Sequence, residues 1–141
     1  MALTKVTHSM SRNSVVDVHD FGAVGDGIAD DTAAIQAALD SSTSNITIAL
    51  GGRDYDYKIT DTLLITGSYK VLDGRGSAID AVFASKTAIE VRPSSTETQL
   101  YSGVVNLDLY GNNATGSSNI GIQISGKSYN AQTENVKINY F

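Results

Sequence analysis

The sequence contains no cysteine, only one proline, and no long apolar run. Without cysteine, the chain can form neither disulfide bridges nor metal sites built on thiolates. No apolar stretch approaches the roughly 20 residues that a membrane-spanning helix needs. The N-terminal residues also lack the apolar core of a secretory signal peptide. We therefore predict a protein that neither enters a membrane nor carries a cleavable signal.

Basic residues are fewer than acidic ones, and they form no cluster. The chain has 10 Lys and Arg against 15 Asp and Glu, which gives a net charge of −5. Proteins that bind nucleic acid through its phosphates need a basic surface, so we expect no nucleic-acid partner. With 141 residues and 41% hydrophobic side chains, the chain suits one folded domain.

The N-terminal third changes its pattern three times. Residues 1–14 are polar and lack a clear period, so they predict an arm or a short helix that attaches to another molecule. Residues Val15–Phe21 alternate from Val16 onward, which predicts a half-buried strand, and the glycine-rich segment Gly22–Gly27 predicts a turn.

A short helix is expected over Thr32–Ser41. Asp30 or Asp31 can serve as its N-cap, because a carboxylate there accepts from free backbone N–H groups and suits the positive end of the helix dipole. Ile35, Ala38 and Leu39 fall on one face at helical spacing, so this face should cover a core.

After Ser44 the sequence consists of short segments of period two that are separated by polar turns. The expected strands are Ile46–Leu50, Tyr57–Ile59, Leu63–Ile65, Tyr69–Leu72, Ala88–Val91, Val104–Leu109, Ile120–Ile124 and Val136–Phe141. The interval from Val105 to Val136 equals that from Ile89 to Ile120, which predicts stacked coils of one common length. A solenoid buries its inner face only when coils stack, whereas a β-sandwich of short strands stays the alternative.

The string from Asp17 to Leu39 closely resembles the opening motif of the pectate lyase-like superfamily. The residues that carry the likeness are Asp20, Phe21, Gly22, Gly25, Asp26, Gly27, Asp30, Asp31, Thr32, Ile35 and Leu39. The resemblance implies an all-β fold, a right-handed parallel β-helix whose N-terminal end is capped by a short α-helix. One departure is Gly51–Tyr55, where many relatives carry a Pro-Ala-Gly-Thr-Tyr-like turn.

Within this superfamily, the short signal-less start resembles that of phage tailspikes. The resemblance implies a virion location, a homotrimer, attachment to a tail or baseplate protein through residues 1–14, and binding of bacterial polysaccharide through coils beyond Phe141. Residues 15–45 would then form the strand, turn and capping helix, and residues 46–141 the first coils. The strand-like ending Val136–Phe141 suggests that the chain is truncated. A fragment of a bacterial polysaccharide lyase or glycoside hydrolase is the alternative.

Two glycine patterns suggest nucleotide binding. Gly121–Ser128 fits the P-loop pattern letter for letter, yet the middle of the segment resembles a strand and no apolar helical stripe follows it. Gly22, Gly25 and Gly27 lie between a strand and a helix, but in the order GxxGxG, and Asp26 would repel a pyrophosphate. Both patterns therefore favour structural turns, and we expect no cofactor.

Metal and catalytic sites are not expected either. Asp26, Asp30 and Asp31 could hold Ca²⁺, but they do not follow a calcium-loop spacing, and helix capping explains Asp30 or Asp31 without a metal. His8 and His19 lack a partner cluster. Glycoside hydrolysis uses two carboxyl groups, and no pair stands out among the acids on or beside strands. These acids are Asp54, Asp56, Asp61, Asp73, Glu90 and Asp108. The resemblance implies that the catalytic carboxylates of the parent lie on middle coils beyond Phe141 or in clefts between subunits.

Overall fold

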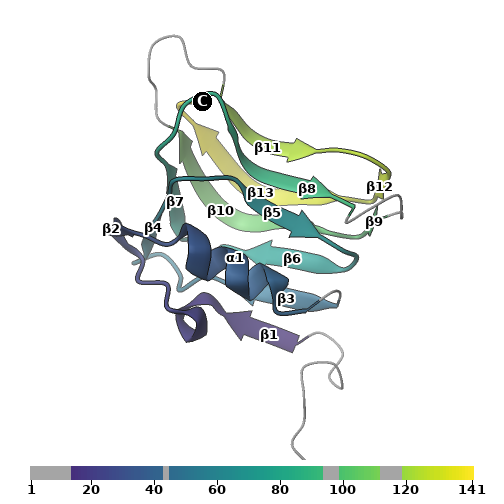
Figure 1. Cartoon of the computed structure of the whole chain (residues 1–141), viewed down its shortest axis with the longest axis horizontal. Coiled ribbons are helices and arrows are strands. Elements are labelled where there is room, and N and C mark those ends of the chain that lie inside the picture. Colours follow the sequence, from purple (N-terminus) through teal and green to yellow (C-terminus); the bar gives the residue numbers. More distant parts are fainter. Residues whose placement is uncertain (1–13, 43–44, 94–98, 112–118) are drawn as a thin grey trace, which may run out of the picture.

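The computed structural model describes residues 14–42, 45–93, 99–111 and 119–141. Its strands are wound into coils that stack along one axis (Figure 1). All strand pairings in these residues are parallel, which excludes an antiparallel sandwich. The predicted right-handed parallel β-helix with a short N-terminal helix is therefore confirmed.

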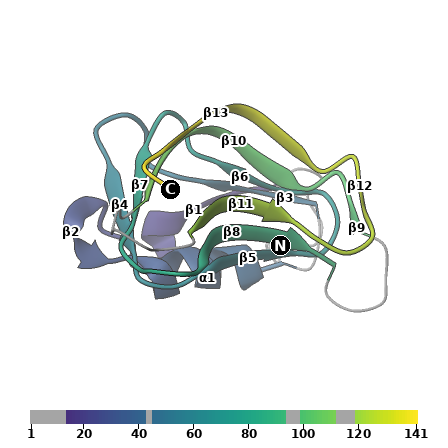
Figure 2. The same ribbon diagram turned by 90° about the horizontal axis from the view of Figure 1, so that it is seen from above.

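Three faces surround one core, as the end-on view shows (Figure 2). The first face contains β1 (Ser14–Asp17), β3 (Ile46–Ala49), β6 (Lys70–Asp73) and the first halves of β10 (Gly103–Gly111) and β13 (Gln132–Asn139). The second face contains β2 (Asp26–Asp30), β4 (Asp56–Ile59), β7 (Ala78–Ala81) and the second halves of β10 and β13. The third face contains β5 (Leu63–Thr66), β8 (Thr87–Arg92) and β11 (Ile120–Ile124). The short strands β9 (Gln99–Leu100) and β12 (Ser128–Tyr129) pair beside them.

The core consists of apolar rows that run along the axis. Ile48 lies opposite Leu72, which lies opposite Val104, and all three are fully buried. Alternation of apolar and polar residues places every second side chain inside. Because the inner face of each coil is covered by the next, the apolar rows stabilise the fold only as a stack.

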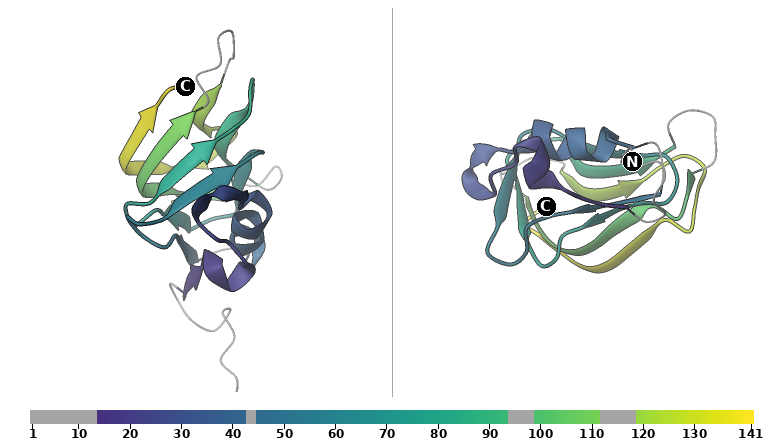
Figure 3. Two further views of the ribbon diagram at one scale, coloured as in Figure 1. Left: turned by 90° about the vertical axis from the view of Figure 1, so that its left-hand side faces the viewer. Right: turned by 90° about the horizontal axis from the view of Figure 1, so that it is seen from below.

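The helix α1 (Thr32–Asp40) occupies the lowest position of the third face. It lies between β2 and β3 in the chain, where the next coils carry β5 and β8, and Figure 3 shows it on the same side as those strands. Ile35, Ala38 and Leu39 are fully buried, so the predicted apolar face is confirmed. The helix ends at Asp40, and Ser41 is its C-cap.

One helical side chain hydrogen-bonds to the edge of the first third-face strand. The Gln36 amide accepts from the backbone N–H of Leu64 at 2.8 Å and donates to its carbonyl at 3.1 Å. These are the two groups that a neighbouring strand would otherwise satisfy. Gln36 therefore protects an edge that would be open to unwanted strand pairing.

The predictions for residues 15–30 were partly wrong. The strand ends at Asp17, whose carboxylate accepts from the N–H of His19 and starts a 3₁₀ turn over Val18–Phe21. The last two residues of the predicted glycine turn, Asp26 and Gly27, belong instead to β2 (Asp26–Asp30), whose backbone pairs with β4. β7 was missed, since Ala78–Ala81 carries a single large apolar residue, Ile79.

The prediction of one common coil length was also wrong. On the first face, Ile46 pairs with Lys70 and Val71 pairs with Gly103, and the second of these intervals along the chain is clearly the longer. Val136 lies opposite Leu107, not Val105, and Ile89 lies opposite Ile122, not Ile120. The strands stack in register while the loops at the corners differ in length, so the spacing varies from coil to coil.

No helix in the described residues has the length and apolarity required to cross a membrane.

Candidate functional site

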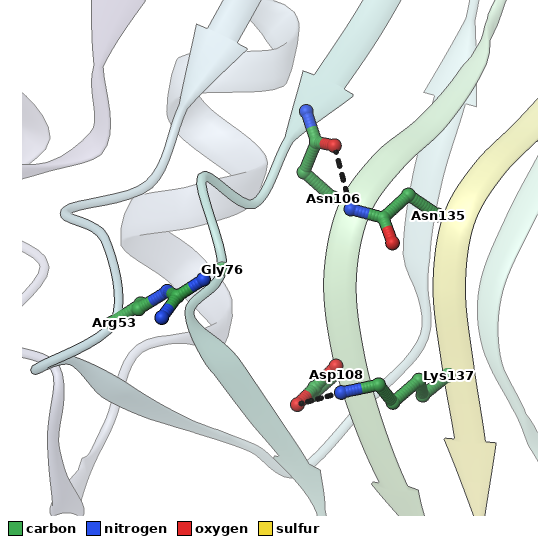
Figure 4. A pocket seen from close by; sticks show the side chains of 6 residues that line it. All are labelled: Arg53, Gly76, Asn106, Asp108, Asn135 and Lys137. Carbon is green, nitrogen blue, oxygen red and sulfur yellow. Dashed lines mark hydrogen bonds and ion pairs between the residues drawn. The ribbon is translucent and has the colours of Figure 1, made fainter.

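An open polar depression of about 420 Å³ lies at the corner where the chain turns from the first face to the second (Figure 4). Residues from successive coils surround it, although they are far apart in the sequence. The lining residues are Arg53, Gly76, Asn106, Asp108, Asn135 and Lys137. Its volume falls within the roughly 300–1,000 Å³ that small-molecule sites occupy.

Two asparagines form the bend of this corner. Asn106 and Asn135 have φ angles of 53° and 52°, in the left-handed region that asparagine tolerates better than most residues. The amide of Asn135 donates to the side-chain oxygen of Asn106 at 3.0 Å, and Asn106 donates to the carboxylate of Asp73 at 3.0 Å. This ladder fixes the corner across three coils.

Two positions beyond each asparagine, a charged side chain points outward from the second face. Asp108 on β10 and Lys137 on β13 are register partners, and their charged groups lie 3.5 Å apart. The ammonium thus pairs with the only carboxylate among the described residues that line the depression.

Arg53 lies across the depression from these four side chains, in the loop between β3 and β4 (Figure 4). Its stem crosses Gly76, where a Cβ atom would come within 2.9 Å of the Arg53 Cγ. Gly76 also has a φ of 86°, so glycine suits both the backbone and the contact. Arg53 has no ion pair or hydrogen bond to any other described residue.

The acidic residues of the opening motif have structural partners. Asp31, only 1% exposed, accepts from the N–H groups of Val24 at 2.7 Å and Gly25 at 3.1 Å, so it fastens the glycine turn and does not cap the helix with its side chain. Asp30 accepts from the N–H of Thr32 at 3.1 Å, which makes it the side-chain cap.

Hydrogen bonds also set the charge state of two motif positions. Those from the Thr32 and Thr60 hydroxyls lower the pKa of Asp30. The N–H groups of Ala29 and Ile28 lower the pKa of Asp26. Within the described part of the chain, no group of three or more His, Asp or Glu residues is arranged to hold a metal.

The remaining motif residues have simpler places. Ile35 and Leu39 are in the core, Asp20 and Phe21 lie at the surface, and Gly22 has a left-handed φ of 94°. At Gly25 a Cβ would come within 2.8 Å of the Tyr55 ring and 2.9 Å of the Tyr57 ring, so the tyrosines require glycine there. A Cβ at Gly27 would come within 3.3 Å of the Asp56 carboxylate.

His19 has two polar neighbours, whereas His8 lies outside the described residues. The Nδ1 atom of His19 lies 2.6 Å from the Asp17 carboxylate, and its Nε2 lies 3.2 Å from the Tyr57 hydroxyl. That hydroxyl also accepts from the N–H of Gly51 at 2.9 Å, and burial raises the pKa of Tyr57 to about 12. Because Tyr57 is fully buried, this chain of hydrogen bonds serves the fold.

The six acids weighed as catalytic candidates are dispersed. Asp61 pairs with Lys86 at 2.9 Å, Glu90 accepts from the Ser125 hydroxyl, and Asp108 faces Lys137. Asp73 accepts from Asn106, and Asp54 is exposed beside Arg53 in sequence.

Asp56 has an acidic neighbour that the sequence analysis did not name. Asp80 lies on the adjacent strand β7. Burial together with the charge of Asp56 raises the pKa of Asp80. Neither residue lines the depression.

The P-loop match is accounted for by strands. Ile120–Ile124 forms β11 and Ser128–Tyr129 forms β12, which pairs with β9. A P-loop requires a helix directly after the Lys-Ser dipeptide. The segment from Gly121 to Ser128 therefore lacks the helix terminus that would hold a phosphate.

Sequence reasoning found Asp108 alone among the lining residues. The signal for the others was a repeated pattern: Asn106-Leu107-Asp108 and Asn135-Val136-Lys137 share the order asparagine, apolar, charged, and they are register partners on adjacent coils. Arg53 and Gly76 gave no such signal, because loops from two other coils bring them to the corner.

Comparisons with known proteins agree with this architecture. Residues 15–50 match the family model described as rhamnogalacturonase A/epimerase, pectate lyase-like. The resemblance to the pectate lyase-like superfamily is confirmed. The chain is also 47% identical over 58 residues to the mannuronan C5-epimerases AlgE5 and AlgE1 of Azotobacter vinelandii, a match that covers 41% of the chain.

Solved structures resemble a larger part of the chain. ORF18 of Geobacillus virus E2 covers 86% of it with a TM-score of 0.77 and 25% identity. The A-module of the epimerase AlgE4 of Azotobacter vinelandii also covers 86%, with a TM-score of 0.65 and 26% identity. The tailspike protein of Acinetobacter baumannii phage AM24 shares the fold, with a TM-score of 0.66 at 15% identity over 92% of the chain.

The chain is short beside all of these proteins. It spans 25% of the viral protein, 37% of the epimerase module and 22% of the tailspike, and 5% or less of the full epimerases.

Proposed function

We propose that the chain is the N-terminal attachment and shaft segment of a phage tailspike. In this proposal residues 1–14, of which only Ser14 is among the described residues, dock to a tail or baseplate protein. The β-helix begins at β1 and continues into coils that bind and degrade a bacterial surface polysaccharide. The parent is a homotrimer in the virion. The observation that carries the proposal is the likeness to the viral ORF18, at a TM-score of 0.77 over 86% of the chain.

Exposed inner-row side chains support a parent with further coils. Ile124 on β11 and Ile138 on β13 are 46% and 50% exposed, although Ile138 continues the row of the buried Leu109. Another coil would cover them, as each coil covers the one before it.

Mass spectrometry of purified phage particles tests the proposal. Peptides of the chain and of a longer continuation should be found in the particle, and a cross-linker should connect Lys5 to a tail protein. The purified parent should elute as a trimer and bind the capsule or O-antigen of its host. A parent that is absent from particles and secreted by a bacterium would contradict the attachment role.

The second candidate is a bacterial enzyme that acts on polysaccharide outside a virion. The 47% identity to the epimerases favours it, because this identity exceeds that to the viral protein. The match covers only 58 residues, however, which is 41% of the chain and 5% of the epimerase. The same virion experiment distinguishes the two candidates.

A further inference from the structure

We propose that the corner depression binds a carboxylated sugar residue of an acidic polysaccharide, with Arg53 as the residue that binds the carboxylate. The inference rests on the proposed polysaccharide-binding function and narrows its ligand class. It also assigns a binding site to the first coils.

The charge of the depression differs in sign from that of the whole chain. Two cations, Arg53 and Lys137, and one anion, Asp108, line it, whereas the chain carries a net charge of −5. Asp108 and Lys137 neutralise each other at 3.5 Å. The unmatched charge is therefore the guanidinium, and an anionic ligand would complement it.

Arg53 is positioned for such a ligand. A guanidinium presents its donors as a rigid fork that matches both oxygens of a carboxylate. The Arg53 stem lies over Gly76, and the head has no acidic partner among the described residues. Some cations on other surfaces of the chain have acidic partners: Lys86 binds Asp61, and Arg92 lies 3.8 Å from Glu90. Arg53 differs from the other described cations without such a partner in that it lines the depression.

The opposite wall suits hydroxyl groups. The amides of Asn106 and Asn135 can both donate and accept, and the Asp108 carboxylate accepts. Sugar hydroxyls do both as well, so a ring with a carboxylate at one side and hydroxyls at the other fits the two walls. A small inorganic anion would need several donors that converge on one point, whereas these groups are distributed over two strands (Figure 4).

The open shape favours a polymer over a free sugar. The Lys137 side chain is 72% exposed, and Arg53 and Asn135 are exposed too. Enclosed pockets bury most of a small ligand. In an open corner, one residue of a chain can bind while its neighbours pass on along the surface.

Calorimetry with defined tetrasaccharides tests the inference on the full chain. The acidic probes are tetramers of β-linked mannuronate, α-linked galacturonate and hyaluronan, and the neutral probe is β-linked mannotetraose, which differs from the first by its carboxylates. We expect at least one acidic tetramer to bind roughly tenfold or more tightly than mannotetraose.

Variants of Arg53 identify the site. Arg53→Gln should weaken acidic binding roughly tenfold or more, and Arg53→Lys should weaken it less, because the charge remains while the fork is lost. Arg92→Gln, which removes the same charge from the third face, should leave the affinity unchanged. Both changes are at exposed positions, and circular dichroism checks that the fold persists.

Three results would overturn the inference: no binding of any acidic tetramer, equal binding of mannotetraose, or an Arg53→Gln affinity equal to that of Arg92→Gln. If the parent still adsorbs to its host polysaccharide in that case, the proposed function stands without the corner site. Failure of the parent itself to adsorb would contradict the proposed function.

Discussion

The covered base of the β-helix and its open corner use the same kinds of polar residue differently. At the base, Gln36 hydrogen-bonds to Leu64, Asp31 to the glycine turn, and Lys70 donates to the carbonyl of Leu39 at 2.7 Å. At the corner, Arg53 and the Asn106–Asn135 pair border a depression that is open to solvent. Polar groups at the base thus satisfy buried backbone, whereas those at the corner face water and can exchange it for a ligand.

The largest loss of stability is expected when a buried side chain of α1 is truncated. Leu39→Ala removes a fully buried side chain, and we expect a loss of about 3 kcal/mol in the free energy of unfolding. Urea denaturation followed by circular dichroism measures it. Ala37→Ser, on the exposed side of α1, should cost less than about 1 kcal/mol. Equal losses would mean that α1 does not depend on this contact.

Loss of the hydrogen bonds between Gln36 and Leu64 should lower the free energy of unfolding somewhat less. Gln36→Met keeps the length of the side chain but leaves the N–H and carbonyl of Leu64 without their partner, and we expect a loss of about 2 kcal/mol.

Hydrogen exchange should report the same change locally. The Leu64 amide is expected to exchange faster in Gln36→Met. Gln123→Met, whose side chain is exposed and accepts from the Thr87 hydroxyl, is the matched control and should leave that amide unchanged. Unaltered Leu64 exchange in the Gln36 variant would disprove the edge contact.

Loss of the hydrogen bonds from the glycine turn to Asp31 should destabilise the protein less again. In Asp31→Asn one side-chain oxygen becomes an NH₂ group that faces a backbone donor, so we expect a loss of about 1–2 kcal/mol. The thermal midpoint should fall accordingly. Asp20→Asn, at an exposed position in the preceding turn, should have little effect.

Asp30, near the covered end of the β-helix, should make the stability of the protein depend on pH. The pKa of Asp30 is lowered in the fold by hydrogen bonds from Thr32 and Thr60, below an unfolded value of about 3.9. Its contribution to stability is therefore complete above that pH and is lost as the pH falls through the folded pKa. The urea midpoint of the native protein should decrease as the pH falls below about 5. The decrease should be shallower in Asp30→Asn, and identical curves would contradict the assignment.

The smallest effect on stability is expected at the corner. Arg53→Gln removes an exposed side chain without a partner among the described residues, so the free energy of unfolding should change by less than about 0.5 kcal/mol. The same urea titration measures this. A loss as large as that of Gln36→Met would show that Arg53 stabilises the fold, and the contrast between base and corner would disappear.

Local patterns were enough to predict most of the β-helix. The alternation in Ile120–Ile124 gave a strand with the predicted bounds, and the spacing of Ile35, Ala38 and Leu39 gave the helix and its buried face. Both depend on neighbours within a short stretch of chain. β7 escaped prediction because Ala78 and Ala81 have little preference for a strand until β4 and β10 pair with them.

The site was much harder to predict than the fold. Asp30 or Asp31 was expected to cap the helix; Asp30 accepts from the N–H of Thr32, whereas the carboxylate of Asp31 turns back to Val24 and Gly25. Which of two neighbouring acids caps the helix depends on the path of the turn, and this path depends on how Tyr55 and Tyr57 pack on Gly25.

The sequence by itself determined that the chain consists of short strands with one helix near its start, because periodicity acts between near neighbours. Only the tertiary structure decided the lengths of the coils and the composition of the corner. Arg53 and Lys137 are far apart in the sequence and line the same depression because parallel strands stack in register, whatever the length of the loops between them.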